Sequence, residues 1–348
     1  MPVIRVNAQA PNTAKPCPSK SRAPLAQMAQ SQGPIVIMTH GYSFLPGDAR
    51  HCPHRHILAS TTQSRDPRAL SWPEAMGLAG PAPYGAAIAF GWAARGSLWQ
   101  AWHAADAAGQ EMAMLITQIR ENYPARPIYL MGHSMGARVI CSALPYLKAG
   151  DVSGAILLAG ATYRRHLADS LNSPAGKSAW IVNVCSLQNR PFDLMLEAAM
   201  GAFGVTGQSI GRGARHPRAL DIQIDAPETQ EGFLRLGIPV ARPKRGFCHW
   251  SVYALPGIFL LYRRLVFDGA ILPQLQNLAQ PQSTKASLIK NISYPLPAAK
   301  LTNPLEFPGK FLPRALVHTG KDVVIRGWHM LKGLYEQSQG SRSGIFGP

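Results

Sequence analysis

The sequence has no apolar run long enough to cross a membrane. A membrane-spanning helix needs roughly 18 consecutive apolar residues. The best stretch here, residues 251–261, is shorter and is soon followed by Arg263 and Arg264. The N-terminal residues also lack the apolar segment of a secretory signal peptide. These two absences predict a cytoplasmic protein without a transmembrane segment.

Cysteines are few and scattered. The chain has five, and none forms the closely spaced pairs of a zinc motif or the even-numbered set of a disulfide framework. They are Cys17, Cys52, Cys141, Cys185 and Cys248. This pattern excludes a small disulfide-stapled fold and fits a reducing compartment.

Acidic residues are also scarce, with 18 Asp and Glu against 35 Lys and Arg, which gives a net charge of +17. Such an excess can indicate a nucleic-acid or anionic membrane partner. However, the excess is concentrated in residues 1–31 and 272–348, and the basic clusters between them are not interleaved with aromatic residues. We therefore expect no nucleic-acid partner. The basic C-terminal residues are compatible with peripheral docking on an anionic membrane surface.

The composition is that of a globular protein, and the hydrophobic pattern along the chain is that of an α/β fold. With 46% hydrophobic residues, the chain is too apolar to be disordered. Between residues 34 and 271, short apolar runs alternate with helical patterns, as expected of a mostly parallel central sheet with helices on both faces. The expected strands are Ile35 to Met38, Ala86 to Trp92, Ile128 to Met131, Ala155 to Ala159 and Trp180 to Cys185. A helix between the second and third strands should bury Met112, Leu115, Ile116 and Ile119.

Three segments lie outside this alternation. Residues 1–33 form an N-terminal extension, and residues 272–348 form a C-terminal extension rich in Pro and Lys. Residues 45–84 interrupt the core, 34–271, with many Pro, Arg and His and little periodicity. Long insertions of this kind are usually lids or binding loops, so we expect a lid-like insertion here.

The most informative segment is Gly-His-Ser-Met-Gly at residues 132–136, between an apolar strand and a helix-compatible run. A GxSxG sequence in this context places the serine on a sharp, strained turn. Side chains at Gly132 or Gly136 would collide with the neighbouring strand and helix. Ser134 is therefore the expected nucleophile, and His133 is expected to be a packing neighbour.

This segment resembles the nucleophile elbow of the α/β-hydrolase superfamily, over roughly residues 34–270. The upstream strand ending in His40 and Gly41 resembles the superfamily's oxyanion turn. The resemblance implies an α/β-hydrolase fold, with backbone N–H groups of Tyr42 and Met135 as the oxyanion hole. Within the superfamily, the sequence is similar to serine esterases, lipases and poorly characterised bacterial members.

The resemblance also implies an acid and a base that follow the serine in the chain. Asp193, after the expected strand 180–185, occupies the position of the acid, with Asp169 and Asp225 as competitors. His249 follows every other element and occupies the position of the base. The expected triad is thus Ser134, Asp193 and His249.

These residues predict a serine hydrolase that cleaves a carboxylic ester of a small molecule or lipid through an acyl-enzyme. The alternatives are an acyltransferase or thioesterase that uses the same triad, or a non-catalytic binding protein with the same fold.

Two further groups of residues could contribute to a site. Cys52, His54 and His56 would share one face of an extended segment, but they lack the second ligand pair of a structural zinc motif. We therefore expect a polar loop beside the active-site mouth, with no metal and no cofactor. Trp92, Trp99 and Trp102 are candidates either for an acyl pocket or for core packing.

Overall fold

The computed structural model describes residues 3–9, 28, 31–63, 66–81, 83–243 and 246–279. The chain divides into two units, residues 1–279 and 280–348. The second unit contains most of the expected C-terminal extension and lies outside the described residues.

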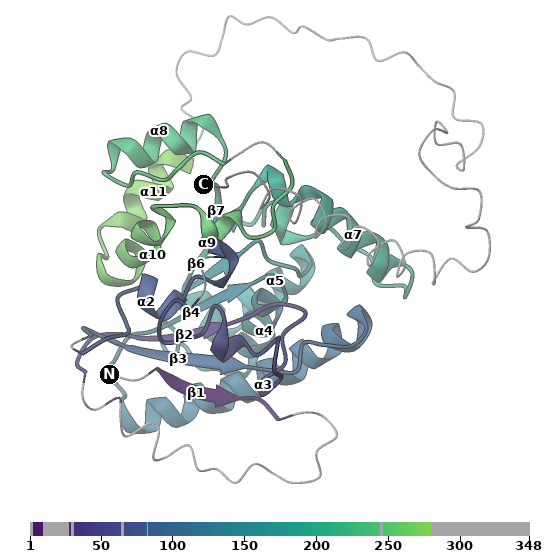
Figure 1. Cartoon of the computed structure of the whole chain (residues 1–348), viewed down its shortest axis with the longest axis horizontal. Helices are drawn as coiled ribbons and strands as arrows, with labels where there is room; N and C mark the ends of the chain where they lie inside the picture. The colour runs from purple at the N-terminus through teal and green to yellow at the C-terminus, as the bar shows by residue number, and fades with distance from the viewer. Residues whose placement is uncertain are drawn as a thin grey trace, which may run out of the picture. The chain divides into compact units, whose positions relative to one another are not determined.

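The first unit is built on a seven-stranded sheet with the order β1-β3-β2-β4-β5-β6-β7 (Figure 1). All six neighbouring pairs are parallel. The strands are β1 (Ile4–Asn7), β2 (Ile35–Thr39), β3 (Ala86–Gly91), β4 (Ile128–His133), β5 (Gly154–Leu158), β6 (Trp180–Cys185) and β7 (Ala219–Gln223). This sheet confirms the expected α/β class and the five expected strands.

The two outer strands were not foreseen. Both are short and only partly buried, so they lack the continuous apolar run that marks the inner strands. β1 also changes the organisation expected from the sequence, because residues 4–7 of the N-terminal extension pair with β3 as an edge of the same sheet.

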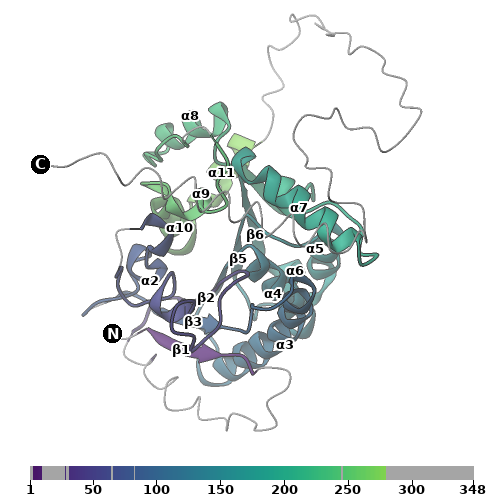
Figure 2. The same cartoon turned by 45° about the vertical axis from the view of Figure 1, so that its right-hand side comes forward.

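Helices cover both faces of the sheet (Figure 2). One face carries α3 (Leu98–Asn122), α4 (Met135–Ala143), α5 (Arg164–Asn172), α6 (Pro174–Ser178) and α7 (Arg190–Gly201). The other face carries α2 (Trp72–Ala75), α8 (Pro227–Arg235), α9 (Ser251–Ala254), α10 (Ile258–Phe267) and α11 (Ile271–Ala279). Short 3-10 helices are η2 (Pro53–Arg55), η3 (Pro67–Ala69), η4 (Leu144–Tyr146), η5 (Leu187–Asn189) and η6 (Ile210–Arg212).

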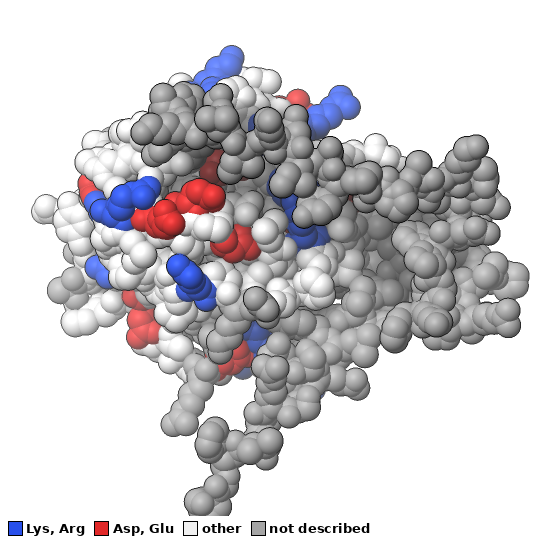
Figure 3. Space-filling view, turned by 90° about the horizontal axis from the view of Figure 1, so that it is seen from above, with Lys and Arg blue, Asp and Glu red and all other residues white. Residues whose placement is uncertain are grey.

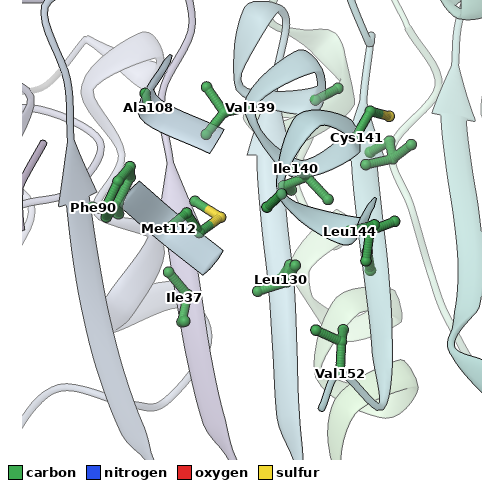
Figure 4. Packing of buried hydrophobic residues seen from close by; sticks show 14 of the residues in the cluster. Ile37, Phe90, Ala108, Met112, Leu130, Val139, Ile140, Cys141, Leu144 and Val152 are labelled. Carbon is green, nitrogen blue, oxygen red and sulfur yellow. The ribbon is translucent and has the colours of Figure 1, made fainter. Parts of the chain in front are cut away.

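The strand period of two divides the core into two clusters. In β2, Ile35 and Ile37 face the layer of α3 and α4, while Val36 and Met38 face the opposite layer. Figure 4 shows Ile37 and neighbouring strand residues beneath residues of α3 and α4. The expected apolar face of α3 is buried as predicted, at Met112, Leu115, Ile116 and Ile119.

The insertion at residues 45–84 is firmly packed over part of its length. Ile57, Leu58 and Trp72 are fully buried, and they belong to the core cluster that also contains α10. Its opening as a lid stays a prediction, but only the exposed parts of the segment can move without unpacking the core.

The C-terminal boundary of the folded unit lies beyond residue 272. Helix α11 buries Ile271 and Leu275, and its Leu278 packs against Gly232 of α8. Among the described residues, none of the helices has the length and apolar character needed to span a bilayer.

Candidate active site

The site lies where β2 and β4 end, at the point where the strand order reverses. The chain passes from β2 to β3 on one side and later returns to form β4 on the other. The strand ends diverge at such a point, which is the usual ligand-binding position in parallel sheets. The turn after β2, at Gly41, and the turn after β4, at Ser134, are in close contact, because a Cβ added at Gly41 would lie 2.6 Å from Ser134 Cβ.

Ser134 has the strained backbone expected of a nucleophile elbow. Its φ is +54° and its ψ is −122°, which non-glycine residues rarely adopt. Its N–H donates to the Leu158 carbonyl at 2.9 Å, and its carbonyl accepts from the Ala161 N–H at 2.9 Å. These bonds from the end of β5 and the loop that follows it hold the turn in place.

The two glycines of the elbow are required by close backbone contacts, as the sequence predicts. A Cβ on Gly132 would lie 2.7 Å from the Gly136 backbone, inside helix α4. A Cβ on Gly136 would lie 2.8 Å from the carbonyl oxygens of Thr39 and His40, at the end of β2. Helix α4 therefore starts in direct backbone contact with both strands of the site.

The turn after β2 is held by His40. Its Nδ1–H donates to the Gly41 carbonyl at 2.9 Å, and its Nε2 accepts from the Trp92 N–H at 3.1 Å. The Trp92 indole N–H donates back to the His40 carbonyl at 3.0 Å. Burial lowers the pKa of His40 from 6.5 to about 3, so the neutral ring that this bonding pattern requires is present at neutral pH. Trp92 thereby belongs to the support of the turn.

Of the two expected oxyanion donors, Met135 directly follows Ser134, and Tyr42 directly follows Gly41, which approaches Ser134. Met135 is the first residue of α4, so its N–H has no acceptor within the helix. Tyr42 follows Gly41, and its hydroxyl donates to the Gly96 carbonyl at 2.6 Å, which anchors the side chain. Their role as an oxyanion hole stays a prediction.

His249 is held beside the elbow by two aromatic neighbours. The His133 Nε2–H donates to the His249 carbonyl at 2.9 Å, and the two rings lie 4.4 Å apart. Phe192 stacks on the His249 ring at 4.9 Å. His133 is therefore a packing neighbour, as expected, and the residue it packs against is His249.

The Ser134 hydroxyl makes no hydrogen bond to His249 within the part of the chain that the structure describes. In free enzymes such bonds are often long, and they tighten when substrate binds.

The expected contact between Asp193 and His249 is corrected by the structure. The His249 Nδ1 instead lies 2.5 Å from the Asn189 Oδ1, and the Asn189 Nδ2 donates to Asp193 Oδ2 at 2.9 Å. The reason is local: after β6 the chain coils into η5 and then α7, rather than remaining a loop. Asn189, at the end of η5, therefore faces the histidine, and Asp193 lies one turn behind it. Asn189 lies in the segment where the sequence predicts the acid, but it is an amide, so looking for a carboxylate does not find it.

Asp193 is buried and held from a second side. It is 3% exposed, and the Ser209 hydroxyl donates to its Oδ1 at 2.8 Å. Burial raises its pKa from 3.8 to about 7, although the bonds from Ser209 and Asn189 act in the opposite direction.

The competing acids have other partners. Asp225 accepts the Ser186 hydroxyl at 2.8 Å and the Leu187 N–H at 2.6 Å, so it holds the start of η5. Asp169 lies on α5. Neither hydrogen-bonds His249 in the described residues.

The insertion at 45–84 borders the histidine segment. The Arg68 guanidinium lies 5.6 Å from the centre of the Trp250 ring, and the Tyr253 hydroxyl donates to the Arg68 carbonyl at 3.4 Å. This contact places part of the expected lid next to His249.

The histidines and cysteine of the insertion make separate contacts. The His54 Nε2 lies 2.6 Å from the Asn7 Oδ1, and the Cys52 sulfur accepts from the Gly47 N–H at 3.4 Å. Across the described residues, no three His, Cys, Asp or Glu side chains are arranged to ligate a metal ion.

The three tryptophans pack rather than line a common pocket. Trp92 and Trp102 are almost fully buried in the core. Trp99 stacks on Phe203 at 4.7 Å.

Comparison with known proteins adds one match. Residues 91–198 match a family model described as serine aminopeptidase, S33. This stretch includes the elbow, Asn189 and Asp193, and it ends before His249. The search of the curated proteins found no match.

Proposed function

Because the chain belongs to the α/β-hydrolase superfamily, we propose that it is a serine hydrolase that cleaves a carboxylic ester through an acyl-enzyme. The observation that carries the proposal is the strained Ser134 turn beside a partly buried histidine whose Nδ1 faces an amide oxygen. An amide oxygen only accepts hydrogen bonds, so His249 keeps its proton on Nδ1 and has a bare Nε2. A bare imidazole nitrogen is what a general base requires.

The reaction then follows from these positions. His249 Nε2 takes the Ser134 proton as the hydroxyl oxygen attacks the ester carbonyl, and Asn189 stabilises the ring orientation of the imidazolium. The Tyr42 and Met135 N–H groups stabilise the oxyanion, each contributing about 3 kcal/mol to lowering the barrier. His249 next protonates the departing alcohol. Water, deprotonated by the same nitrogen, releases the acid from Ser134.

The surroundings of the site favour an apolar substrate, such as a lipid or another ester with an apolar acyl group. Leu187, Leu194 and Phe247 lie within a few residues of Asn189, Asp193 and His249, and each is about half exposed or more. Large apolar side chains exposed near a site usually contact a ligand or another apolar surface.

The family match supports a second candidate, which is cleavage of an amide at a peptide N-terminus. The same serine and histidine perform both reactions, so substrates must separate them. A p-nitrophenyl ester series and aminoacyl p-nitroanilides, tested side by side on the purified full-length protein, distinguish the two by kcat/KM.

The nucleophile is tested with a fluorophosphonate probe and intact mass spectrometry. We expect one label per chain in the wild-type protein and none in Ser134→Ala, because only an activated serine attacks the phosphorus. Ser142→Ala is the matched control. Ser142 also lies on α4 near a histidine and an aspartate, since its hydroxyl is 2.7 Å from Asp106 and 3.3 Å from His166. That variant should label like the wild type.

Two results would contradict the proposal. Labelling that persists in Ser134→Ala would assign the nucleophile to another residue. A folded wild-type protein that neither labels nor hydrolyses any ester would favour the non-catalytic binding protein.

A further inference from the structure

We propose that Asp193 is a positioning residue that acts through Asn189, fixing the amide so that its oxygen faces His249. The inference rests on the proposed function, in which His249 is the base for Ser134. It adds that the orienting group is a two-residue relay rather than a single carboxylate.

The orientation of the Asn189 amide decides which nitrogen of His249 carries the proton. With the oxygen toward His249, at 2.5 Å, the Nδ1 must be a donor. If the amide turned over, its NH₂ group would face Nδ1, which would then have to accept. The ring proton would move to Nε2, and that nitrogen could no longer take a proton from Ser134.

The Asp193 carboxylate selects the productive orientation. An ionised carboxylate only accepts hydrogen bonds, so it binds the Asn189 NH₂ group, at 2.9 Å, and turns the oxygen toward His249. The carboxylate itself is fixed by the Ser209 hydroxyl, at 2.8 Å. The backbone of Gly211 packs against it so closely that a Cβ there would lie 2.1 Å from Asp193 Oδ1. Asp193 is only 3% exposed, so water has little access to replace these hydrogen bonds.

Charged and titratable groups face this carboxylate from three elements. Glu197, on the same helix α7, raises its pKa, and Arg212 of η6 lowers it. Cys185 at the end of β6 is the third neighbour, and burial raises the pKa of its thiol so that it stays neutral. Burial is the largest effect and brings the pKa of Asp193 to about 7.

The relay predicts how activity depends on pH. Once protonated, Asp193 can donate to the Asn189 oxygen, and the amide is released to turn. Activity should therefore fall as pH decreases through about 7. Protonation of His249 does not account for a change there, because burial and the neighbouring His133 lower its pKa well below 6.5.

The test is a double-mutant cycle on the full-length protein. Asp193→Asn keeps the shape of the side chain but no longer fixes the orientation of the Asn189 amide. We therefore expect kcat/KM to fall about tenfold or more, and the decrease in activity near pH 7 to disappear. In an Asn189→Asp background, His249 has its own carboxylate. There, adding Asp193→Asn should leave kcat/KM unchanged or raise it. A purely structural role for Asp193 would give the same loss in both backgrounds.

Glu197→Gln is the control on the same helix. It removes a charge near Asp193, but its amide oxygen can still accept the Ser209 N–H that Glu197 Oε1 accepts at 2.7 Å, so kcat/KM at pH 8.5 should match the wild type. The decline should move to lower pH, because Glu197 raises the pKa of Asp193.

The inference is overturned if Asp193→Asn keeps wild-type kcat/KM and pH dependence, or if the loss is equal in both backgrounds. If circular dichroism shows that Asp193→Asn does not fold, two other measurements test the inference. They are the activity of the double variant Asn189→Asp, Asp193→Asn and the pH profile of the wild type. A flat wild-type profile across pH 7, or a double variant with far less activity than Asn189→Asp alone, overturns it. Failure of the proposed function is distinguishable, since the wild-type protein would then not label at Ser134.

Discussion

Gly136 is the residue at which helix α4 packs against the end of β2. Its Cα faces backbone carbonyl oxygens at the end of β2, and backbone cannot move aside as a flexible side chain can. We expect Gly136→Ala to lower the free energy of unfolding by about 1–3 kcal/mol. It should also abolish fluorophosphonate labelling, because α4 would shift away from β2 and carry the Met135 N–H with it.

Gly201→Ala is the control for this change. Gly201 also lies in a helix, but a Cβ there would meet nothing within 4 Å. Alanine favours helices over glycine by up to about 1 kcal/mol, so this variant should be as stable as the wild type or slightly more stable. Urea denaturation of both variants gives the comparison. Equal stability of the two would mean that the contact at Gly136 is easily relieved.

At the scale of elements, helix α4 is tied to α3 by a charged pair. Arg138 of α4 is 9% exposed, and its guanidinium donates to the Asp106 carboxylate of α3 at 2.7 Å. The same guanidinium lies 3.7 Å from the centre of the Trp102 ring, and it donates to the Trp102 carbonyl at 3.2 Å. The helix that begins at the nucleophile is therefore fixed one turn later by a buried cation.

Removing the partner of that cation should destabilise the protein. Asp106→Ala leaves Arg138 buried without its carboxylate, which should lower the free energy of unfolding by about 2 kcal/mol. The value is below that of a fully buried pair because Asp106 is itself 35% exposed. Glu231→Ala, which breaks an exposed pair with Arg235 on α8, should change stability by less than about 0.5 kcal/mol. Similar losses in both variants, measured by urea denaturation, would show that Arg138 finds other partners.

At the scale of the whole molecule, buried neutral histidines make stability depend on pH. Burial lowers the pKa of His40 to about 3 and the pKa of both His54 and His133 to about 4. In the unfolded chain these rings titrate near 6.5. Between these limits the unfolded state binds more protons than the folded state, so stability falls as pH decreases. Asp193 acts in the opposite direction, because its pKa is raised on folding.

These three histidines and His249, whose pKa is also lowered, outweigh the one aspartate. The urea concentration at the midpoint of unfolding should therefore decrease as the pH is lowered from 7 to 5. Each histidine contributes up to about 1.4 kcal/mol per pH unit in that range. Repulsion within a chain of net charge +17 would also grow on acidification. Repeating the titration in 0.5 M KCl separates the causes, because salt screens repulsion but not desolvation. A midpoint that no longer depends on pH in high salt would assign the effect to repulsion.

On the face shown in Figure 3, the basic side chains of the described residues do not gather into one patch, and acidic side chains lie near them. This distribution agrees with the sequence, in which much of the excess lies in the end segments. Docking of residues 272–348 on anionic membranes stays a prediction.

Much of the fold could be predicted because its signals are local. β2 and β4 are buried on both faces, so their apolar runs are continuous, and the elbow needs glycines at fixed spacings from Ser134. The edge strand β1 escaped prediction because it is four residues long and half exposed, so its pattern does not differ from that of an extension.

The sequence by itself determined the parallel sheet, the strained serine turn, and the segments in which a base and its orienting group would lie. Only the tertiary structure decided that Asn189, and not Asp193, faces His249. Asn189 and His249 are 60 positions apart in the sequence. Asn189 rather than Asp193 reaches the His249 ring because of where η5 ends and α7 begins, and because of how His133 and Phe192 hold the ring. Hydrogen bonds are sensitive to a few tenths of an ångström, whereas the hydrophobic patterns that specify strands and helices tolerate far larger shifts.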